Sequence, residues 1–236
     1  MDGILNVLTH GDIEVEGLLP WGSNYTFLVQ MAYEDVACAA VYKPSSGERP
    51  LWDFPRGSLY QREYAAYVVS EALGWELVPP TIMRQGPHGV GSLQYYVEHD
   101  SEQHYFTFKE LYLPQTRQIA LFDIVINNAD RKSGHVLLAP DERLWAIDHG
   151  VCFHTDYKLR TVIWEYVGEA IEPQLLEGLS CLVADLEEPL SEVRRALKEI
   201  LTIQEVAALL KRTRHLVETA IFPEPGPGRP YPWPPV

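Results

Sequence analysis

The chain has 236 residues, of which 46% are hydrophobic and 22% charged, so it can bury a substantial core and is not disordered over most of its length. Its 33 acidic and 19 basic residues give a formal net charge of −14, which argues against general binding to nucleic acid or to anionic membranes. No stretch is long and apolar enough to span a bilayer, and the first residues lack the pattern of a signal peptide. Three widely spaced cysteines form neither a disulfide framework nor a zinc motif. We therefore expect a cytoplasmic protein without integral membrane association.

The first half of the sequence is predicted to form mainly strands. After a turn-rich segment at 17–24, two short β-prone runs at 26–31 and 36–42 are predicted to pair as a hairpin. The stretch 43–60 is rich in proline, glycine and charge and is interpreted as a loop. A helix is predicted over 60–73, where apolar residues recur at helical spacing.

Two further extended segments are predicted after that helix. Residues 77–82 contain a Pro-Pro pair, which disfavours helix, and residues 92–97 are β-prone. A glycine-rich turn at 86–89 separates the two, and the polar residues 98–104 are interpreted as a connector.

The second half is predicted to be helical apart from one short hairpin. A helix over 115–127 precedes two apolar runs at 136–138 and 144–147, which are joined by a Pro-Asp-Glu-Arg turn. Beyond residue 172 the chain is again predicted to be helical.

The last helix and the tail behind it carry clear local signals. Thr202 is the predicted N-cap, Glu205 completes a capping box with it, and the helix is predicted to run to about Phe222. The tail at 223–236 holds 7 prolines in 14 residues, which predicts an extended polyproline II segment outside the core. A packed or solvated tail is the favoured interpretation, and binding of a partner by the tail is the alternative.

Strands followed by helices predict an α+β fold with two lobes. We expect one domain over residues 1–222. Its N-terminal β-rich lobe would span about 1–98 and its C-terminal helical lobe about 105–222, with the proline-rich tail outside both.

Three groups in the strand-rich half are of types that bind phosphate. The turn of Gly22, Ser23 and Asn24 offers backbone N–H groups to phosphate oxygens. Lys43 ends an apolar strand, where its ammonium can reach a phosphate, and Glu63 on the next helix can hold that lysine in place. Each group also has an ordinary interpretation: a tight turn, a lysine leaving the core at a strand edge, and a solvated helix charge.

A fourth group surrounds the predicted hairpin of the second half. Asp130 and His135 precede this hairpin and Asp148 follows it, so we expect their side chains to meet at one end. One carboxylate can orient a nucleophile while another holds Mg²⁺ on a phosphate. An acid close to a glycine is also ordinary turn chemistry. The order of all four groups along the chain nevertheless favours a phosphate site.

The order of these motifs resembles a known family. A Gly-Ser turn, Val-Tyr-Lys-Pro, a helix glutamate, Asn-Ala-Asp-Arg and Ile-Asp-His-Gly are similar in sequence and order to the phosphatidylinositol 3-/4-kinase-like branch of the protein-kinase fold. The type II phosphatidylinositol 4-kinases and the HipA-type bacterial kinases belong to that branch, and the resemblance is more specifically to a family of bacterial kinase-like proteins. It covers about residues 17–153; beyond them only the helical character is similar.

The resemblance implies a small kinase-like fold with a site for ATP. Gly22, Ser23 and Asn24 would cover the phosphates of ATP. Lys43 would contact the α- and β-phosphates, steadied by Glu63. The hinge that binds adenine would be formed by Tyr96, Val97 and Glu98.

The resemblance also implies catalytic and metal-binding residues. Asp130 would position the acceptor hydroxyl, with Arg131 beside it, and Asp148 would bind Mg²⁺. His135 stands where relatives carry a metal-binding asparagine, and its softer imidazole suits Mn²⁺ better than Mg²⁺. The Asp-His-Gly motif is a second departure. Both departures leave open which metal binds and whether bound nucleotide is turned over.

We expect an ATP-dependent phosphotransferase that moves the γ-phosphate of ATP to a hydroxyl acceptor, which is a protein, a small molecule or a lipid. The alternative is a regulatory module that binds nucleotide without turnover. A metal-dependent phosphohydrolase using His135, His149 and His154 is less favoured, because no paired histidine or cysteine spacing supports it. Lys158 and Arg160 form a small basic spot that either meets an anionic acceptor or is simply solvated.

Overall fold

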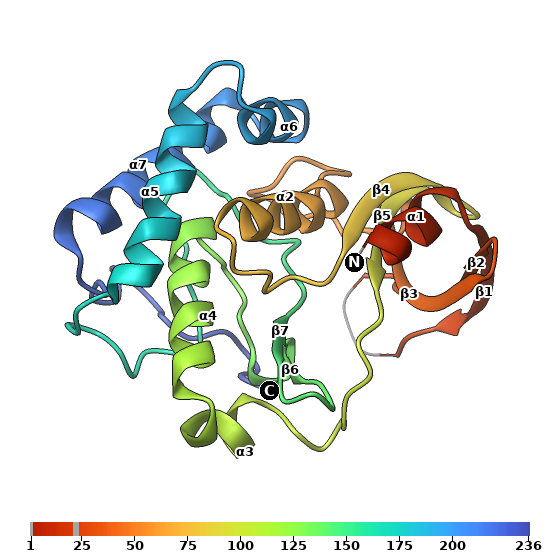
Figure 1. Ribbon diagram of the computed structural model, residues 1–236, viewed down its shortest axis with the longest axis horizontal. Coiled ribbons are helices and arrows are strands. Elements are labelled where there is room, and N and C mark those ends of the chain that lie inside the picture. The colour runs from red at the N-terminus through yellow and green to blue at the C-terminus, as the bar shows by residue number, and fades with distance from the viewer. Residues whose placement is uncertain (1, 21–23) are drawn as a thin grey trace.

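Figure 1 shows the computed structural model of the chain, which describes residues 2–20 and 24–236. The strand-rich lobe contains a five-stranded antiparallel sheet in the order β1-β2-β3-β5-β4. In chain order, the elements up to residue 95 are α1 (Asp2–His10), β1 (Asp12–Leu18), β2 (Phe27–Tyr33), β3 (Val36–Pro44), α2 (Leu59–Ala72), β4 (Thr81–Gly86) and β5 (Gly89–Tyr95). The predicted first hairpin is confirmed as β2 and β3, in which Met31 lies opposite Cys38.

The second lobe is helical except for one two-stranded sheet (Figure 1). Its elements are α3 (Tyr105–Phe108), α4 (Leu113–Ile126), β6 (Val136–Leu138), β7 (Leu144–Ala146), α5 (Pro173–Glu187), α6 (Glu192–Ile200) and α7 (Ile203–Thr219). Short 3-10 turns lie at η1 (Ser45–Gly47), η2 (Lys109–Leu111) and η3 (Ser133–His135). The α+β fold with two lobes is therefore confirmed. Over residues 2–20 and 24–236, none of the helices combines the length and the apolar character needed to cross a membrane.

The first two elements, α1 and β1, were not predicted from the sequence. Helix α1 buries Val7 and Leu8 against the sheet, in one cluster with Met31 of β2. Strand β1 pairs along β2 at the edge of the sheet, and most of its side chains are exposed. The alternation Asp-Ile-Glu-Val-Glu over residues 12–16 has the period of a strand and is the signal that could have found it. The predicted extended segment 77–82 forms a strand only from Thr81 onward.

Helix α2 belongs to the core of the helical lobe, although it lies between two strands in sequence. Its residues Ala65 and Val69 are fully buried in the same cluster as side chains of α4, α5 and α7. Arg62 adds polar anchors: its Nη1 donates to the carbonyl of Cys152 at 2.7 Å, and its Nη2 forms a buried ion pair with Glu205 of α7. The helix is therefore fixed to the helical lobe while one end faces the sheet.

The capping box predicted for the last helix is confirmed. The Thr202 hydroxyl accepts a hydrogen bond from the Glu205 N–H at 3.2 Å, and the Glu205 carboxylate accepts one from the Thr202 N–H at 2.8 Å. These bonds satisfy N–H groups that the first helical turn leaves without partners. Helix α7 ends at Thr219, a little before the predicted end.

Replacing Thr202 with alanine is expected to lower the free energy of unfolding by about 1 kcal/mol, because the N-cap acceptor is lost. Urea denaturation of the wild type and the variant measures the difference. The matched variant Thr202→Ser keeps the hydroxyl and should retain most of the stability. Equal destabilisation by serine and alanine would assign the effect to the methyl group of the threonine instead of its cap.

The proline-rich tail packs on the helical lobe. The carbonyl of Pro230 accepts hydrogen bonds from the Thr161 N–H at 3.0 Å and from the indole N–H of Trp164 at 3.2 Å. The carbonyl of Pro235 accepts one from the Ser133 N–H at 2.8 Å. Because proline has no backbone N–H, the carbonyl groups are the main polar groups of a proline-rich segment. Here two of these carbonyls accept hydrogen bonds from the helical lobe. The tail is packed, as the favoured interpretation had it.

Candidate active site

Lys43, near the end of β3, lies between two carboxylates. Its ammonium is paired with Glu63 of α2 and with Asp148, whose Oδ1 is 2.9 Å from Nζ. Burial favours the neutral amine, but the carboxylates of Asp148 and Glu63 outweigh it and raise the pKa of Lys43 above its ordinary value. The lysine is therefore charged and held at the junction of the two lobes.

Glu63 is almost fully buried and connects three parts of the site. Its side chain is 3% exposed. One carboxylate oxygen pairs with Lys43, and the other accepts a hydrogen bond from the backbone N–H of His149 at 2.9 Å. The structure thus brings the predicted helix glutamate together with the predicted lysine and the Asp-His-Gly motif.

Asp148 follows β7 and points its carboxylate into the space between the lobes. Its side chain remains 47% exposed, and its backbone has a φ of 61°, in the left-handed region that few residues other than glycine adopt. Such strained positions cluster at functional sites. The ammonium of Lys43 holds the pKa of Asp148 well below its usual range, so the carboxylate is ionised.

His135 lies beside Asp148. Its Nδ1 is 3.0 Å from the carbonyl oxygen of Asp130 and 3.4 Å from the backbone nitrogen of Lys132, and its Nε2 is 3.3 Å from Asp148 Oδ2. Burial lowers the pKa of His135 to about 4, so the ring is neutral.

An imidazole nitrogen and a carboxylate oxygen are both electron-pair donors that can bind a divalent cation. His135 and Asp148, the two predicted metal-binding residues, bring such a pair together at 3.3 Å. In the part of the chain that the structure describes, no group of three or more His, Cys, Asp or Glu side chains is arranged to hold a metal ion. Any remaining ligands would come from phosphate or water oxygens, which is how Mg²⁺ is commonly held in nucleotide sites.

Asp130 lies in the loop after α4 with its carboxylate toward solvent. Its side chain is 36% exposed, and Oδ2 is 3.6 Å from the Lys132 ammonium. Burial raises the pKa of Asp130 to about 6, although Lys132 opposes the shift. A carboxylate with a pKa in this range can accept a proton from a nearby hydroxyl near neutral pH.

Arg131 does not reach the space that Asp130 faces. Its side chain is fully buried, and its guanidinium pairs with Asp123 at 2.9 Å. It also donates to the carbonyl oxygens of His135 at 3.0 Å and Ile147 at 2.7 Å. The prediction that Arg131 is a catalytic residue beside the acceptor was therefore wrong. This arginine instead positions the loop of Asp130 and the β6–β7 hairpin through its buried hydrogen bonds.

Two residues of this buried network were not among the predicted site residues. Asp123 of α4 accepts bonds from Arg131, from the Asn128 amide at 3.0 Å and from the Thr161 hydroxyl at 3.2 Å. His149 accepts a bond on Nε2 from Arg131 at 2.8 Å, and burial keeps the ring neutral by holding the pKa of His149 well below its ordinary value. An aspartate within an apolar helix is the signal that could have pointed to Asp123.

The predicted hinge joins β5 to the helical lobe. The N–H of Tyr96 donates to the carbonyl of Ala39 at 3.0 Å. Val97 is buried against Leu137 and Trp145 of the β6–β7 sheet, whereas Glu98 is exposed. Tyr96 and Val97 therefore link the sheet of the first lobe to the β6–β7 sheet of the second.

Of the predicted glycine turn, Gly22 and Ser23 lie outside the described residues. Asn24 is described, and its side-chain oxygen accepts a hydrogen bond from the Arg49 N–H at 2.7 Å. This bond ties the end of the turn to the loop between β3 and α2.

A cavity of about 350 Å³ opens beside Asp130. The β3–α2 loop forms one wall, and the loop of Asp130 with the segment after Asp148 forms the other. Its lining includes Asn24, Arg49, Trp52, Asp130, Lys158 and Arg160. A carboxylate that can accept a proton therefore faces a space large enough for a small molecule.

The sequence of the chain is similar to those of several known proteins. Residues 58–199 match the family model for phosphatidylinositol 3- and 4-kinase. Protein Rv2133c of Mycobacterium tuberculosis is 39% identical over 97% of this chain and 94% of its own length. Phosphatidylinositol 4-kinase gamma 4 of rice, Oryza sativa subsp. japonica, is 31% identical over 48% of this chain, but the match covers only 23% of the rice protein. The chain thus matches about a quarter of that plant relative.

Solved structures share the fold. The Golgi casein kinase with Mn/ADP bound has a TM-score of 0.60 at 16% identity, covering 92% of this chain and 74% of that chain. The Helicobacter pylori proinflammatory kinase CtkA has a TM-score of 0.55 at 11% identity, covering 90% of this chain and 93% of that chain. Likeness at such low identity shows a common fold and leaves the chemistry to be argued from the site.

Proposed function

Because the chain belongs to the phosphatidylinositol 3- and 4-kinase family, we propose that it is an ATP-dependent phosphotransferase that moves the γ-phosphate of ATP to a hydroxyl acceptor. The observation that carries the proposal is the set of charges at the lobe junction. Lys43, Glu63 and Asp148 are in contact there, and Asp130 faces a cavity nearby. In phosphate transfer the protein acts mainly by positioning and by electrostatic stabilisation, for which fixed charges of this kind are suited.

Each group has a role in this scheme. Lys43 binds the α- and β-phosphates, kept charged and in place by Glu63. The hinge Val97 provides the surface for adenine. Asp148 and His135 would hold a divalent metal, which supplies charge neutralisation at the phosphate oxygens. The presence of Mn/ADP in the Golgi casein kinase structure supports both cofactors.

Asp130 orients the acceptor hydroxyl and takes its proton. The hydroxyl oxygen forms a bond to the γ-phosphorus, and the bond from that phosphorus to the oxygen bridging the β- and γ-phosphates breaks, so ADP leaves. Asn24, at the end of the glycine turn, and the turn residues Gly22 and Ser23 are proposed to cover the phosphates. Arg131 holds the loop that presents Asp130.

The variant Asp130→Ala tests this proposal. It is expected to bind ATP nearly as well as the wild type, because Asp130 does not contact the predicted nucleotide groups, and to lose phosphate transfer. Calorimetry measures ATP binding, and radiolabelled ATP with a metabolite or protein mixture measures transfer. Equal transfer by the wild type and Asp130→Ala would refute the assignment.

The pH dependence of transfer follows from the same residue. The pKa of Asp130 is raised to about 6, so the carboxyl keeps its proton up to a higher pH than an ordinary aspartate. A protonated carboxyl cannot accept the acceptor proton, so the transfer rate is expected to fall as the pH is lowered through about 6. Rates at saturating ATP between about pH 5 and pH 8 measure this. A rate unchanged down to about pH 5, with the fold intact by circular dichroism, would contradict the role of Asp130.

A regulatory module that binds nucleotide without turnover is the second candidate. The observation that favours it is His135, at the position where the resemblance to the kinase family implies a metal-binding asparagine. Turnover of the γ-phosphate measured with Mg²⁺ and with Mn²⁺ separates the two functions. ATP binding without turnover in either metal would establish the regulatory module, whereas turnover with Mn²⁺ alone would fit an enzyme with an altered metal site.

The phosphohydrolase alternative finds little support in the positions of its histidines. The Nε2 of His149 is occupied by Arg131, and the ring of His154 packs edge-on against Phe54 at 5.4 Å. We further propose a cytoplasmic location, since Cys38, Cys152 and Cys181 are all free thiols.

A further inference from the structure

We propose that the cavity beside Asp130 binds a soluble alcohol that carries an anionic group, such as a phosphorylated polyol, and that Arg49 and Arg160 hold that anion. The inference rests on the proposed function, because it assigns the acceptor of the same reaction. It adds a binding subsite with named residues and a chemical class of substrate.

The charges around the cavity are opposite to those of the whole chain. The chain carries a net charge of −14, yet three cations, Arg49, Lys158 and Arg160, line the cavity together with the carboxylates of Asp53 and Asp130. Lys158 is paired with Asp53 at 2.7 Å, so these two charges compensate each other. The charges of the cavity lining that remain are those of Arg49, Arg160 and Asp130.

Arg49 and Arg160 are available to a ligand. Over residues 2–20 and 24–236, no carboxylate oxygen lies within 4.0 Å of either guanidinium group, and both side chains are exposed. Because both guanidinium groups line one cavity, they can bind the same external anion. A guanidinium presents paired N–H groups that match two oxygens of a phosphate or a carboxylate.

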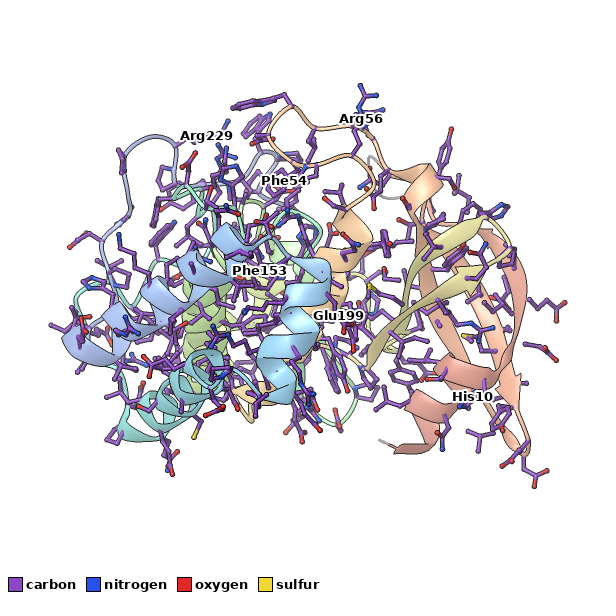
Figure 2. The ribbon with its side chains drawn as sticks, turned by 90° about the horizontal axis from the view of Figure 1, so that it is seen from above. His10, Phe54, Arg56, Phe153, Glu199 and Arg229 are labelled. Atoms are coloured by element: carbon purple, nitrogen blue, oxygen red, sulfur yellow. The ribbon has the colours of Figure 1, made fainter. Side chains whose placement is uncertain are left out.

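The cavity is bounded by a loop that is fixed to the helical lobe. In the β3–α2 loop, Asp53 pairs with Lys158, whose ammonium lies 5.0 Å from the ring centre of Trp52. Phe54 is buried against His154, and the guanidinium of Arg62 lies 4.8 Å from the centre of its ring. Figure 2 shows Phe54 directed toward the helical lobe, whereas Arg56 of the same loop points outward. The wall that carries Arg49 is therefore held in place before a ligand binds.

The size and the aromatic rim suit a small polyol. A volume of about 350 Å³ lies at the lower end of the range for small-molecule sites. Trp52 lines the cavity and is 92% exposed, so its indole face is open to the carbon atoms of a ligand.

The same anion could come from a lipid headgroup or from a free metabolite. A bilayer of anionic lipid repels a protein with a net charge of −14, whereas a soluble phosphate ester reaches the two arginines by diffusion. The charge balance therefore favours the soluble source.

Binding of defined probes tests the subsite without turnover. We would first saturate the full chain with a non-hydrolysable ATP analogue and Mn²⁺. We would then titrate it with glycerol 3-phosphate, ribose 5-phosphate or inositol 1-phosphate, and separately with glycerol, ribose and inositol, the uncharged parents of these esters. Calorimetry is expected to detect at least one phosphate ester and to show at least about tenfold weaker binding of its parent. Arg49→Gln and Arg160→Gln should each weaken binding of the ester by about tenfold.

Controls separate this effect from general changes. Arg195→Gln removes the same charge from the exposed surface of α6, outside the cavity lining, and should leave binding unchanged. Trp52 fluorescence, assigned with Trp52→Phe, should change with the ester. Equal binding of ester and parent, equal affinity of the arginine variants and the wild type, or binding of none of the probes would overturn the inference.

Transfer assays show whether the anionic acceptor is soluble or lipid-bound. They also test the phosphotransferase activity and the anion subsite separately. Labelled phosphate should move to the soluble ester and not to vesicles of phosphatidylinositol in phosphatidylcholine. Transfer to vesicles alone would overturn the soluble acceptor. Transfer to the phosphate ester by Arg49→Gln and Arg160→Gln with the wild-type rate and KM would keep the phosphotransferase and refute the anion subsite. Ester binding through the arginines without any ATP turnover would keep the subsite and refute the phosphotransferase.

Discussion

Replacing Asp148 with asparagine is expected to lower the rate of phosphate transfer by about a thousandfold or more. Asp148 has two partners at once: its Oδ1 pairs with Lys43 at 2.9 Å, and its Oδ2 lies 3.3 Å from Nε2 of His135. An amide has no charge to offer the lysine, and its neutral carbonyl oxygen is a weaker metal ligand than a carboxylate. The variant would therefore lose the charge that holds Lys43 and weaken one of the two donors proposed to hold the metal.

The substitution is well suited to the backbone at this position. Asp148 has a φ of 61°, and asparagine tolerates this left-handed conformation as readily as aspartate does. The fold should consequently survive, which thermal denaturation would verify. Transfer of labelled γ-phosphate at saturating ATP, with Mg²⁺ and with Mn²⁺, measures the loss. Asp35→Asn, in the exposed turn between β2 and β3, is the matched control and should transfer at the wild-type rate. A loss of less than about tenfold in Asp148→Asn would remove Asp148 from the proposed metal site.

The variant Arg131→Met is expected to lower the free energy of unfolding by about 3–5 kcal/mol. Arg131 and Asp123 are both fully buried and are paired at 2.9 Å. Without the arginine, the Asp123 carboxylate stays buried with only the Asn128 amide and the Thr161 hydroxyl as partners. A buried carboxylate without a cation is costly because it has left water for a medium of low dielectric constant.

A second variant separates the lost pair from the lost packing. In Asp123→Leu combined with Arg131→Met, the uncompensated charge is absent, so the double variant should be more stable than Arg131→Met alone. Urea denaturation of the wild type, the two single variants and the double variant gives the comparison. A double variant as unstable as the sum of the two single variants would show that the charges do not act as a pair. Arg131→Lys should recover little, because one ammonium cannot serve Asp123, His149 and two carbonyls in the plane of the guanidinium.

Much of the fold and the family could be predicted from local sequence signals. The β2–β3 hairpin, helix α2 and the capping box of α7 each follow from patterns within a few residues of one another. The order of motifs also led to the phosphatidylinositol 3- and 4-kinase family, which the family match confirms. Strand β1 escaped prediction because it is a short edge strand with little buried surface.

The site residues could be predicted where their type and order along the chain indicate a role. They could not be predicted where the role of a side chain depends on its burial in the folded protein. Lys43, Glu63, His135 and Asp148 do come together, although they are far apart in sequence. The sequence around Arg131 does not reveal whether its guanidinium faces the acceptor or the core. That choice depends on Asp123, which is buried beneath the loop in the folded chain.

The loop between β3 and α2 illustrates the same limit. Its proline, glycine and charge content correctly predicted the absence of regular structure over most of its length. Its role as a cavity wall arises from contacts with a segment about 100 residues later, such as the pairing of Asp53 with Lys158. No local pattern encodes a contact of that sequence separation, so the sequence around Arg49 and Trp52 does not indicate that these residues line a cavity.

The anchoring of α2 in the helical lobe has a consequence for control of the site. In protein kinases, activity can be switched by moving the helix that carries the glutamate partner of the lysine. Here Ala65 and Val69 are buried in the helical core, and Arg62 is bound to Cys152 and Glu205. Swinging α2 outward would expose this apolar surface and break a buried ion pair, so an inactive position of the helix is energetically remote. The packing of α2 therefore holds Glu63 where it contacts Lys43 and the backbone N–H of His149.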